Sequence, residues 1–191
     1  MIRRQEIATA LGEVLPLIQN AALREKVLDC FLLAIEEGRW TSLKDLEEMP
    51  FTLLTGTRGV SFLEHTLAVT KGAIGLARGQ MEAYRQMPYP IDMDRLVAGG
   101  ILHDVGKLLE IERRPDGTYA KSRRGEYARH PISGAILAAK VGLPDDIVNT
   151  IACHAREGEG APKVVETVLI HQADFATFDP LVMLGKGTLI V

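Results

Sequence analysis

Apolar residues recur at the spacing of an α-helix through most of this chain, and segments that alternate like a β-strand are scarce. A helix with one apolar stripe must bury that stripe against other helices. The sequence therefore predicts an all-α fold, built as a bundle of packed helices. We expect these helices to cover approximately residues 5–20, 22–38, 43–49, 62–86, 92–111, 127–141, 144–155 and 162–178.

Two connections interrupt the helical pattern. Pro88 and Pro90 disfavour a helix that runs through them, so they separate two of the longer helices. The Pro-Asp-Gly sequence at residues 115–117 is typical of a tight turn, and it predicts a short hairpin near residues 113–124. We expect the tail from Leu184 onward to be extended.

The balance of charge and apolar residues excludes several classes of partner. The chain carries a net charge of −3, so it lacks the broad basic surface of a dedicated nucleic-acid-binding protein. Glu6 and Glu13 interrupt the apolar stretch that a signal peptide needs, and no apolar run reaches the roughly 20 residues of a membrane span. Cys30 and Cys153 are too far apart to indicate a disulfide framework. We therefore expect a cytoplasmic protein whose partner is neither a membrane nor a nucleic acid.

One predicted helix contains a His-Asp pair, His103 and Asp104, within the mostly apolar stretch AGGILHDVGKLLEI at residues 98–111. Burying ionisable side chains without partners is costly, so the pair needs a compensating ligand. A carboxylate has two oxygens and can bridge two metal ions, whereas a neutral imidazole offers one nitrogen to one ion. The pair is therefore suited to the corner of a metal cluster.

The remaining ligands of such a cluster have to come from other segments. Candidates occur singly among apolar neighbours on four further predicted helices, and a helical bundle can bring such residues to one interior site. A lone histidine in an apolar helix is more often a hydrogen-bonded core residue, and a single aspartate is often a cap or a surface group. Taken together, however, the set predicts a metal centre. These candidates are His65, His130, His154 and Asp174.

The ordered pattern His65, His103-Asp104, His130, His154 and Asp174 resembles the HD superfamily of metal-dependent phosphohydrolases. The phrase LHDVGK is similar to the subgroup signature His-Asp-Ile-Gly-Lys, with Val105 in place of isoleucine. The resemblance covers about residues 60–180 and implies an HD-domain helical bundle with its metal site among the central helices. It also implies that His65, His103, Asp104 and Asp174 hold one metal. Asp104 would bridge to a second metal, held also by His130 and His154.

This resemblance also narrows the activity. The stretch CHAREGEGAPK lacks the His-His-Glu and Gly-Tyr-Pro signatures of the cyclic-di-GMP phosphodiesterase branch, which argues against that activity. HPISGAILA and IVNTIACHA are similar to helices of ribonuclease Y and of diadenosine tetraphosphate hydrolases in the superfamily. The resemblance divides the chain into residues 1–55, a helical segment of unassigned role packed on the core, and residues 56–191, the HD domain.

The expected cofactor is a pair of divalent metal ions. Imidazole and carboxylate ligands without thiolate suit Fe, Mn, Co, Ni or Zn, and Mg also remains a candidate. The resemblance favours iron or manganese. Two such ions can activate a water and neutralise phosphoryl charge, which predicts a phosphomonoesterase or phosphodiesterase acting on a nucleotide or another small phosphorylated compound. The ligands alone do not separate this activity from a di-iron oxygenase or a nucleotide-binding regulatory module, and a homo-oligomer remains open.

Further residues near the predicted ligands are candidates for catalysis and substrate binding. We assign a catalytic role to Asp104 and to Lys107, which shares the helical flank of the His-Asp pair and can reach a substrate phosphate. Arg124 and Arg129 precede a ligand and could bind phosphate bidentately, although such charges often lie on a solvated face. His171 lies three residues before Asp174 and could contact substrate, orient a ligand or simply pack.

Overall fold

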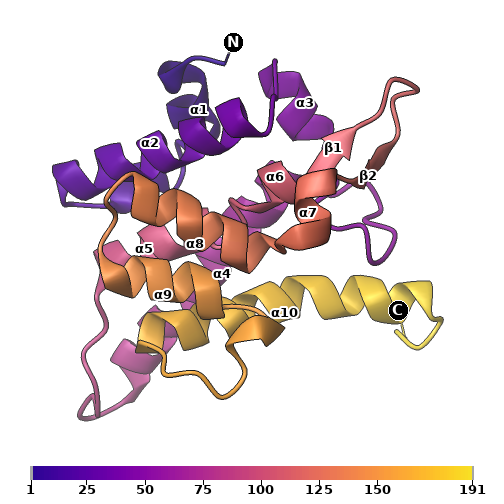
Figure 1. Cartoon of the computed structure of the whole chain (residues 1–191). Helices are drawn as coiled ribbons and strands as arrows, with labels where there is room; N and C mark the ends of the chain where they lie inside the picture. The colour runs from indigo at the N-terminus through magenta and orange to yellow at the C-terminus, as the bar shows by residue number, and fades with distance from the viewer. Residues whose placement is uncertain (1, 191) are drawn as a thin grey trace.

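The structure, a computed structural model, describes residues 2–190 and consists of helices with one small hairpin (Figure 1). Strands β1, Ile111–Arg113, and β2, Tyr119–Lys121, pair antiparallel with Arg113 opposite Tyr119. Gly117 adopts a φ of 84° in the connecting turn, a conformation that favours glycine. The predicted all-α class and the predicted hairpin are both confirmed.

Ten α-helices and two short 3₁₀ helices make up the rest of the regular structure within the described residues. Ser42, Ser61 and Asp92 cap three of the helices, each accepting a hydrogen bond from a backbone N–H of the first turn. The α-helices are α1 Arg4–Ala10, α2 Ala21–Glu37, α3 Leu43–Glu48, α4 Phe62–Ala83, α5 Met93–Leu102, α6 Lys107–Glu110, α7 Arg123–Tyr127, α8 His130–Lys140, α9 Asp145–Cys153 and α10 Val165–Gly185. The 3₁₀ helices are η1 Leu15–Leu17 and η2 Arg156–Gly158.

Three predicted helix ends lie well away from the observed ones. The helix expected over 5–20 ends at Ala10 and is followed by η1, which contains Pro16. The helix expected over 92–111 stops at Leu102, and residues 103–106 form a turn before α6. The tail expected to be extended from Leu184 is helical through Gly185, because α10 continues past Pro180.

A close backbone approach accompanies the break at residues 103–106. A Cβ on Gly106 would lie 2.1 Å from the carbonyl oxygen of His130 and 2.6 Å from the nitrogen of Gly134. Only glycine therefore allows the turn after α5 to lie directly against the first turn of α8. This contact brings His130 towards the His-Asp pair.

Helix α4 packs against α3, α5 and α10, while α8 packs against α2, α6 and α9. Figure 1 shows α1 and α2 lying along one side of this assembly, and α10 along the other. Side chains from the first 55 residues, such as Ile7, Leu11 and Phe31, belong to the same buried cluster as those of the later helices. Trp40 Nε1 also donates a hydrogen bond to the carbonyl of Leu108, at 2.7 Å. The division of the chain at residues 55 and 56 stays a prediction.

None of the helices among residues 2–190 combines the length and apolar character needed to cross a membrane. The longest, α4 with 22 residues and α10 with 21, both carry charged side chains along their length.

Candidate metal centre

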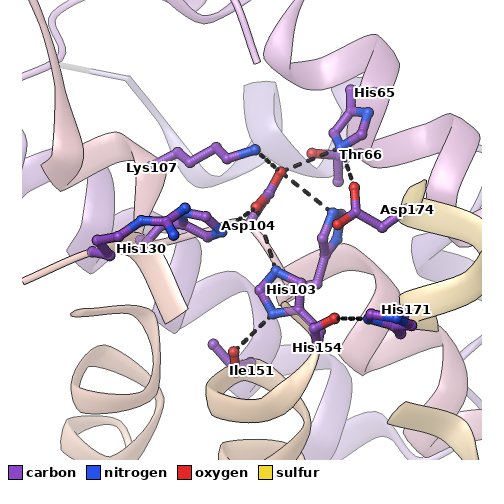
Figure 2. Close-up of polar contacts among 12 residues, drawn as sticks. His65, Thr66, His103, Asp104, Lys107, His130, Ile151, His154, His171 and Asp174 are labelled. Atoms are coloured by element: carbon purple, nitrogen blue, oxygen red, sulfur yellow. Dashed lines mark hydrogen bonds and ion pairs between the residues drawn. The ribbon is translucent and has the colours of Figure 1, made fainter. Parts of the chain in front are cut away.

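The structure brings the predicted ligand candidates together in the interior, although they come from separate elements (Figure 2). His65 projects from α4 and Asp174 from α10, while His103 and Asp104 lie in the turn after α5. His130 is the first residue of α8, and His154 follows directly after α9. All are buried except Asp174, whose side chain is 15% exposed.

Asp104 lies at the centre of this cluster and divides it into two groups. Its Oδ2 lies 3.3 Å from His65 Nε2 and 3.4 Å from His103 Nε2. Its Oδ1 lies 3.2 Å from His130 Nε2 and 3.6 Å from His154 Nε2. Each oxygen of one carboxylate therefore faces a different pair of imidazoles, which is the arrangement of a bridging ligand.

Asp174 completes the first group, since its Oδ1 lies 3.1 Å from His65 Nε2. In each group the candidate ligand atoms lie within 4.8 Å of one another, and Asp104 belongs to both groups. The first group, four residues, is His65, His103, Asp104 and Asp174; the second, three residues, is Asp104, His130 and His154.

The second nitrogen of each imidazole is engaged by the protein. Such outer partners fix the ring orientation of metal-binding histidines. A carbonyl oxygen can only accept a hydrogen bond, so the rings bonded to carbonyls carry their proton on Nδ1 and, when neutral, point an Nε2 lone pair at the carboxylates. The partners of Nδ1 are Gly100 O for His103 at 2.7 Å, Ile151 O for His154 at 2.8 Å, Glu110 Oε2 for His130 at 2.9 Å, and Thr177 Oγ1 for His65 at 3.3 Å.

The inward-facing atoms lack hydrogen-bond partners within the described residues. These buried atoms are the Nε2 of His65, His103 and His154 and the Oδ1 of Asp104. Leaving one buried polar group unpaired costs about 1–3 kcal/mol, and here several lone pairs face one another. Cations placed between these atoms would satisfy the unpaired groups and would relieve the repulsion between their lone pairs. The donor set therefore fits divalent metal ions with mixed nitrogen and oxygen ligation.

A cavity of about 620 Å³ opens next to the cluster, and Lys107, His130 and Asp174 belong to its wall. Lys107 Nζ lies 2.5 Å from Asp104 Oδ2 and its side chain is 12% exposed, so it stands between the cluster and the cavity. The remaining wall contains cationic and apolar residues together with the carboxylates of Glu110 and Asp179. The other cationic residues are Lys121, Arg129, Arg156 and Lys186, and the larger apolar ones are Phe51, Leu53, Leu54, Ile111, Phe175, Phe178 and Val182.

A comparison with protein-family models identifies the family of this chain. The family model described as HD domain matches residues 62–176, which contain every member of the cluster. The chain belongs to the HD domain family. The predicted resemblance is thereby confirmed.

Three relatives of this HD protein are similar over different lengths. A protein of Methanocaldococcus jannaschii named dihydroneopterin 2',3'-cyclic phosphate phosphodiesterase is 28% identical over 168 residues, which are 83% of this chain and 64% of that protein. Ribonuclease Y of Pseudothermotoga lettingae is 32% identical over 116 residues, 61% of this chain and 18% of its own length. Ribonuclease Y of Thermotoga maritima is 31% identical over 94 residues, 49% of this chain and 16% of its own length.

This HD chain therefore spans less than two thirds of the length of each of these relatives. No solved structure matches it.

Lowered pKa values keep two carboxylates and one imidazole of the HD cluster deprotonated, as metal ligands must be. Burial raises the pKa of Asp104, but the charges of Lys107 and His103 outweigh it and hold that pKa well below the ordinary value. Burial likewise raises the pKa of Asp174, and its contact with His65 more than reverses this. Burial lowers the pKa of His130 to about 4, so this imidazole is neutral near pH 7.

The other residues proposed to bind substrate lie in three different settings. Arg129 lines the cavity and pairs with Glu157 at 2.7 Å. His171 is not a wall residue; its Nδ1 donates to the carbonyl oxygen of His154 at 2.6 Å, so it supports a ligand's backbone. Arg124 is not a wall residue either, because a 2.6 Å ion pair holds its guanidinium at Glu37 on α2. Its position removes Arg124 from the substrate site that we propose.

Sequence reasoning missed three side chains that contact the candidate ligands: Glu110, Phe51 and Thr177, the partner of His65 Nδ1. Glu110 accepts hydrogen bonds from both the backbone N–H and the Nδ1–H of His130, at 2.7 and 2.9 Å. Glu110 lies one helical turn after Lys107, which could have indicated that it lies near the site. Its hydrogen-bond partner His130, however, lies 20 residues further along the chain. Phe51 stacks on His65, and an apolar residue in a loop offers no chemical signal of such a contact.

Proposed function

We propose that this HD protein is a dinuclear metal-dependent phosphodiesterase that acts on a small, nucleotide-like phosphate ester. The observation that carries the proposal is the central position of Asp104, with one carboxylate oxygen directed at each pair of imidazoles. This position supports two metal ions with Asp104 as the bridge: His65, His103 and Asp174 would hold the first, and His130 and His154 the second. Iron or manganese is the preferred pair, as the family resemblance suggests.

When bound, two such ions supply an activated water and neutralise negative charge on the phosphoryl oxygens. The chain itself adds a cation, Lys107, at the edge of the cluster. Lys107 contacts Asp104 and lines the cavity, so its ammonium can turn to a phosphate oxygen without leaving the site. A substrate phosphate seated there would have Lys107 on the cavity side and the imidazoles on the protein side.

The mixed composition of the cavity wall supports a substrate that carries both a phosphate and an apolar ring. Lys107 and Arg129 offer charge to the phosphate, and Phe175 and Phe178 offer ring faces to the other part. Its volume of about 620 Å³ is within the range of small-molecule sites. A relative named for a 2',3'-cyclic phosphate substrate is consistent with this, so cyclic phosphodiesters are the first compounds to test.

The test is a substrate panel with purified protein loaded with Mn²⁺ or Fe²⁺. We expect hydrolysis of nucleoside 2',3'-cyclic phosphates or of a cyclic phosphate of a pterin, with weak activity on a long single-stranded RNA. Asp104→Asn should reduce turnover to the level of metal-stripped protein. Asp116→Asn is the control, because Asp116 lies in the exposed hairpin turn and bonds only to Thr118.

Three results would redirect the assignment. Rapid cleavage of RNA with no activity on small esters would identify a ribonuclease. Oxygen uptake by the reduced iron form, without phosphate chemistry, would identify an oxygenase. Tight nucleotide binding with no turnover under any metal would identify a regulatory module.

A further inference from the structure

Phe51 connects the part of the chain outside the HD match to the candidate metal centre. Its side chain is 1% exposed, and its ring stacks on the imidazole of His65 with centroids 4.0 Å apart and planes 17° apart. Lys107 Nζ lies 5.5 Å from the centre of the same ring, and Phe178 meets it edge-on at 6.4 Å. One phenyl ring thus contacts a candidate ligand and the candidate catalytic lysine together.

The backbone fixes the position of this ring relative to α4. The N–H of Phe62 donates to the carbonyl of Met49 at 2.8 Å, and Pro50 forms a bridge with Ser61. Ser61 is the N-cap residue of α4, which carries His65 in its first turns. The segment with Phe51 is therefore hydrogen-bonded to the start of the helix whose histidine it covers.

His65 has the weakest polar support among the histidines of the cluster. Its Nδ1 contact to Thr177 Oγ1 measures 3.3 Å, whereas the corresponding contacts of His103, His130 and His154 measure 2.7, 2.9 and 2.8 Å. The Thr177 hydroxyl also donates to the carbonyl of Asp174, at 2.8 Å, so it is free only to accept from His65. The Nε2 of His65 faces the Asp104 and Asp174 carboxylates, and the stacked Phe51 ring is the contact that covers the face of this imidazole.

We infer that Phe51 is a positioning residue of the metal centre, which holds the His65 imidazole in its ligating orientation and keeps the Lys107 ammonium beside the cluster. The face of a phenyl ring carries partial negative charge, and it therefore favours both an imidazole polarised by a metal ion and an ammonium group. The inference rests on the metal centre of the proposed function but not on its substrate. It gives Phe51, which lies outside the HD match, a role in the site.

The experiment compares Phe51→Leu and Phe51→Met with Phe51→Tyr, which keeps the ring. Phe31→Leu is the matched control, because Phe31 is also fully buried and packs against Phe62 rather than against a candidate ligand. Binding of Mn²⁺ to metal-free protein is measured by calorimetry, and thermal unfolding is followed in parallel. Loss of an aromatic contact corresponds to about a 3- to 10-fold weaker Mn²⁺ dissociation constant.

We expect the leucine and methionine variants at Phe51 to lose this affinity, the tyrosine variant to retain it, and the control to lose thermal stability alone. If Phe51→Leu does not fold, Phe51→Met fills most of the space and decides the result. Equal Mn²⁺ affinity in the Phe51→Met variant and the wild type would overturn the inference, as would a similar loss in Phe31→Leu. Because the readout is metal binding, failure to hydrolyse any phosphate ester would refute the proposed function and leave this test intact.

Discussion

Glu110 offers the sharpest test of the second half of the cluster. Its Oε2 accepts two hydrogen bonds from His130, one from the backbone N–H at 2.7 Å and one from Nδ1–H at 2.9 Å. Because both bonds end on one oxygen, the amide oxygen of Glu110→Gln can accept both, and the substitution removes mainly the negative charge. A hydrogen bond to a charged group is worth about 1 kcal/mol more than one to a neutral group. Loss of the charge at Glu110 therefore weakens the two hydrogen bonds to His130 by about 2 kcal/mol in total.

Only the part of this energy that strengthens on metal binding enters the binding constant, so 2 kcal/mol sets an upper bound of about 30-fold, within the 10- to 100-fold range typical of outer-shell partners of metal ligands. We therefore expect Glu110→Gln to weaken one of two Mn²⁺ binding steps by about 10- to 30-fold and to leave the other unchanged. Calorimetric titration of the metal-free protein measures both steps. Glu112→Gln, an exposed residue of β1, is the control. Two unchanged binding steps in Glu110→Gln would refute the assignment of His130 as a ligand.

Three further predictions follow from the same geometry. Gly106→Ala should lower the free energy of unfolding by about 3 kcal/mol, because its Cβ would lie 2.1 Å from the His130 carbonyl oxygen; a melting temperature within a degree of the wild type would contradict this. In metal-free protein the ring signals of His130 should complete no more than about a tenth of their titration shift by NMR between pH 8 and 5, because burial lowers its pKa to about 4; a midpoint near the ordinary 6.5 would count against it. Arg129→Ala should raise KM about 10-fold for a phosphate substrate, through loss of a charge-assisted contact, while Arg124→Ala changes KM less than about twofold; equal effects would be inconsistent with their positions.

Local chemistry explains why much of the fold was predictable. Helices α4, α5 and α9 each have a recurring apolar stripe, and Ser42 precedes its helix as a cap residue, so neighbours in sequence define these elements. The candidate ligands were visible because ionisable side chains stand out among apolar ones. His154 and Asp174 are examples, each isolated in an otherwise apolar segment.

The features that could not be predicted depend on contacts between distant segments. The turn at residues 103–106 has helix-forming neighbours, and the close approach of Gly106 to α8 becomes evident only when both segments are in place. Arg124 and Arg129 have similar surroundings in sequence, but Glu37 on α2 draws one of them away from the cavity. The loop sequence around Phe51 gives no indication of a role. Phe51 reaches His65 because the backbone hydrogen bond between Phe62 and Met49 holds this loop against the start of α4.

The different partners of the imidazole Nδ1 atoms affect how such a centre can evolve. His103 and His154 bond to the main-chain carbonyls of Gly100 and Ile151, three residues earlier in each case, and no side-chain replacement deletes a carbonyl. His65 and His130 depend instead on side chains, Thr177 and Glu110, and these belong to different halves of the cluster. Each half therefore has one ligand anchored by invariant backbone and one whose basicity a single codon change can alter. In the dinuclear centre that we propose, substitutions at Thr177 and at Glu110 would therefore act on different metal ions while the scaffold stays the same.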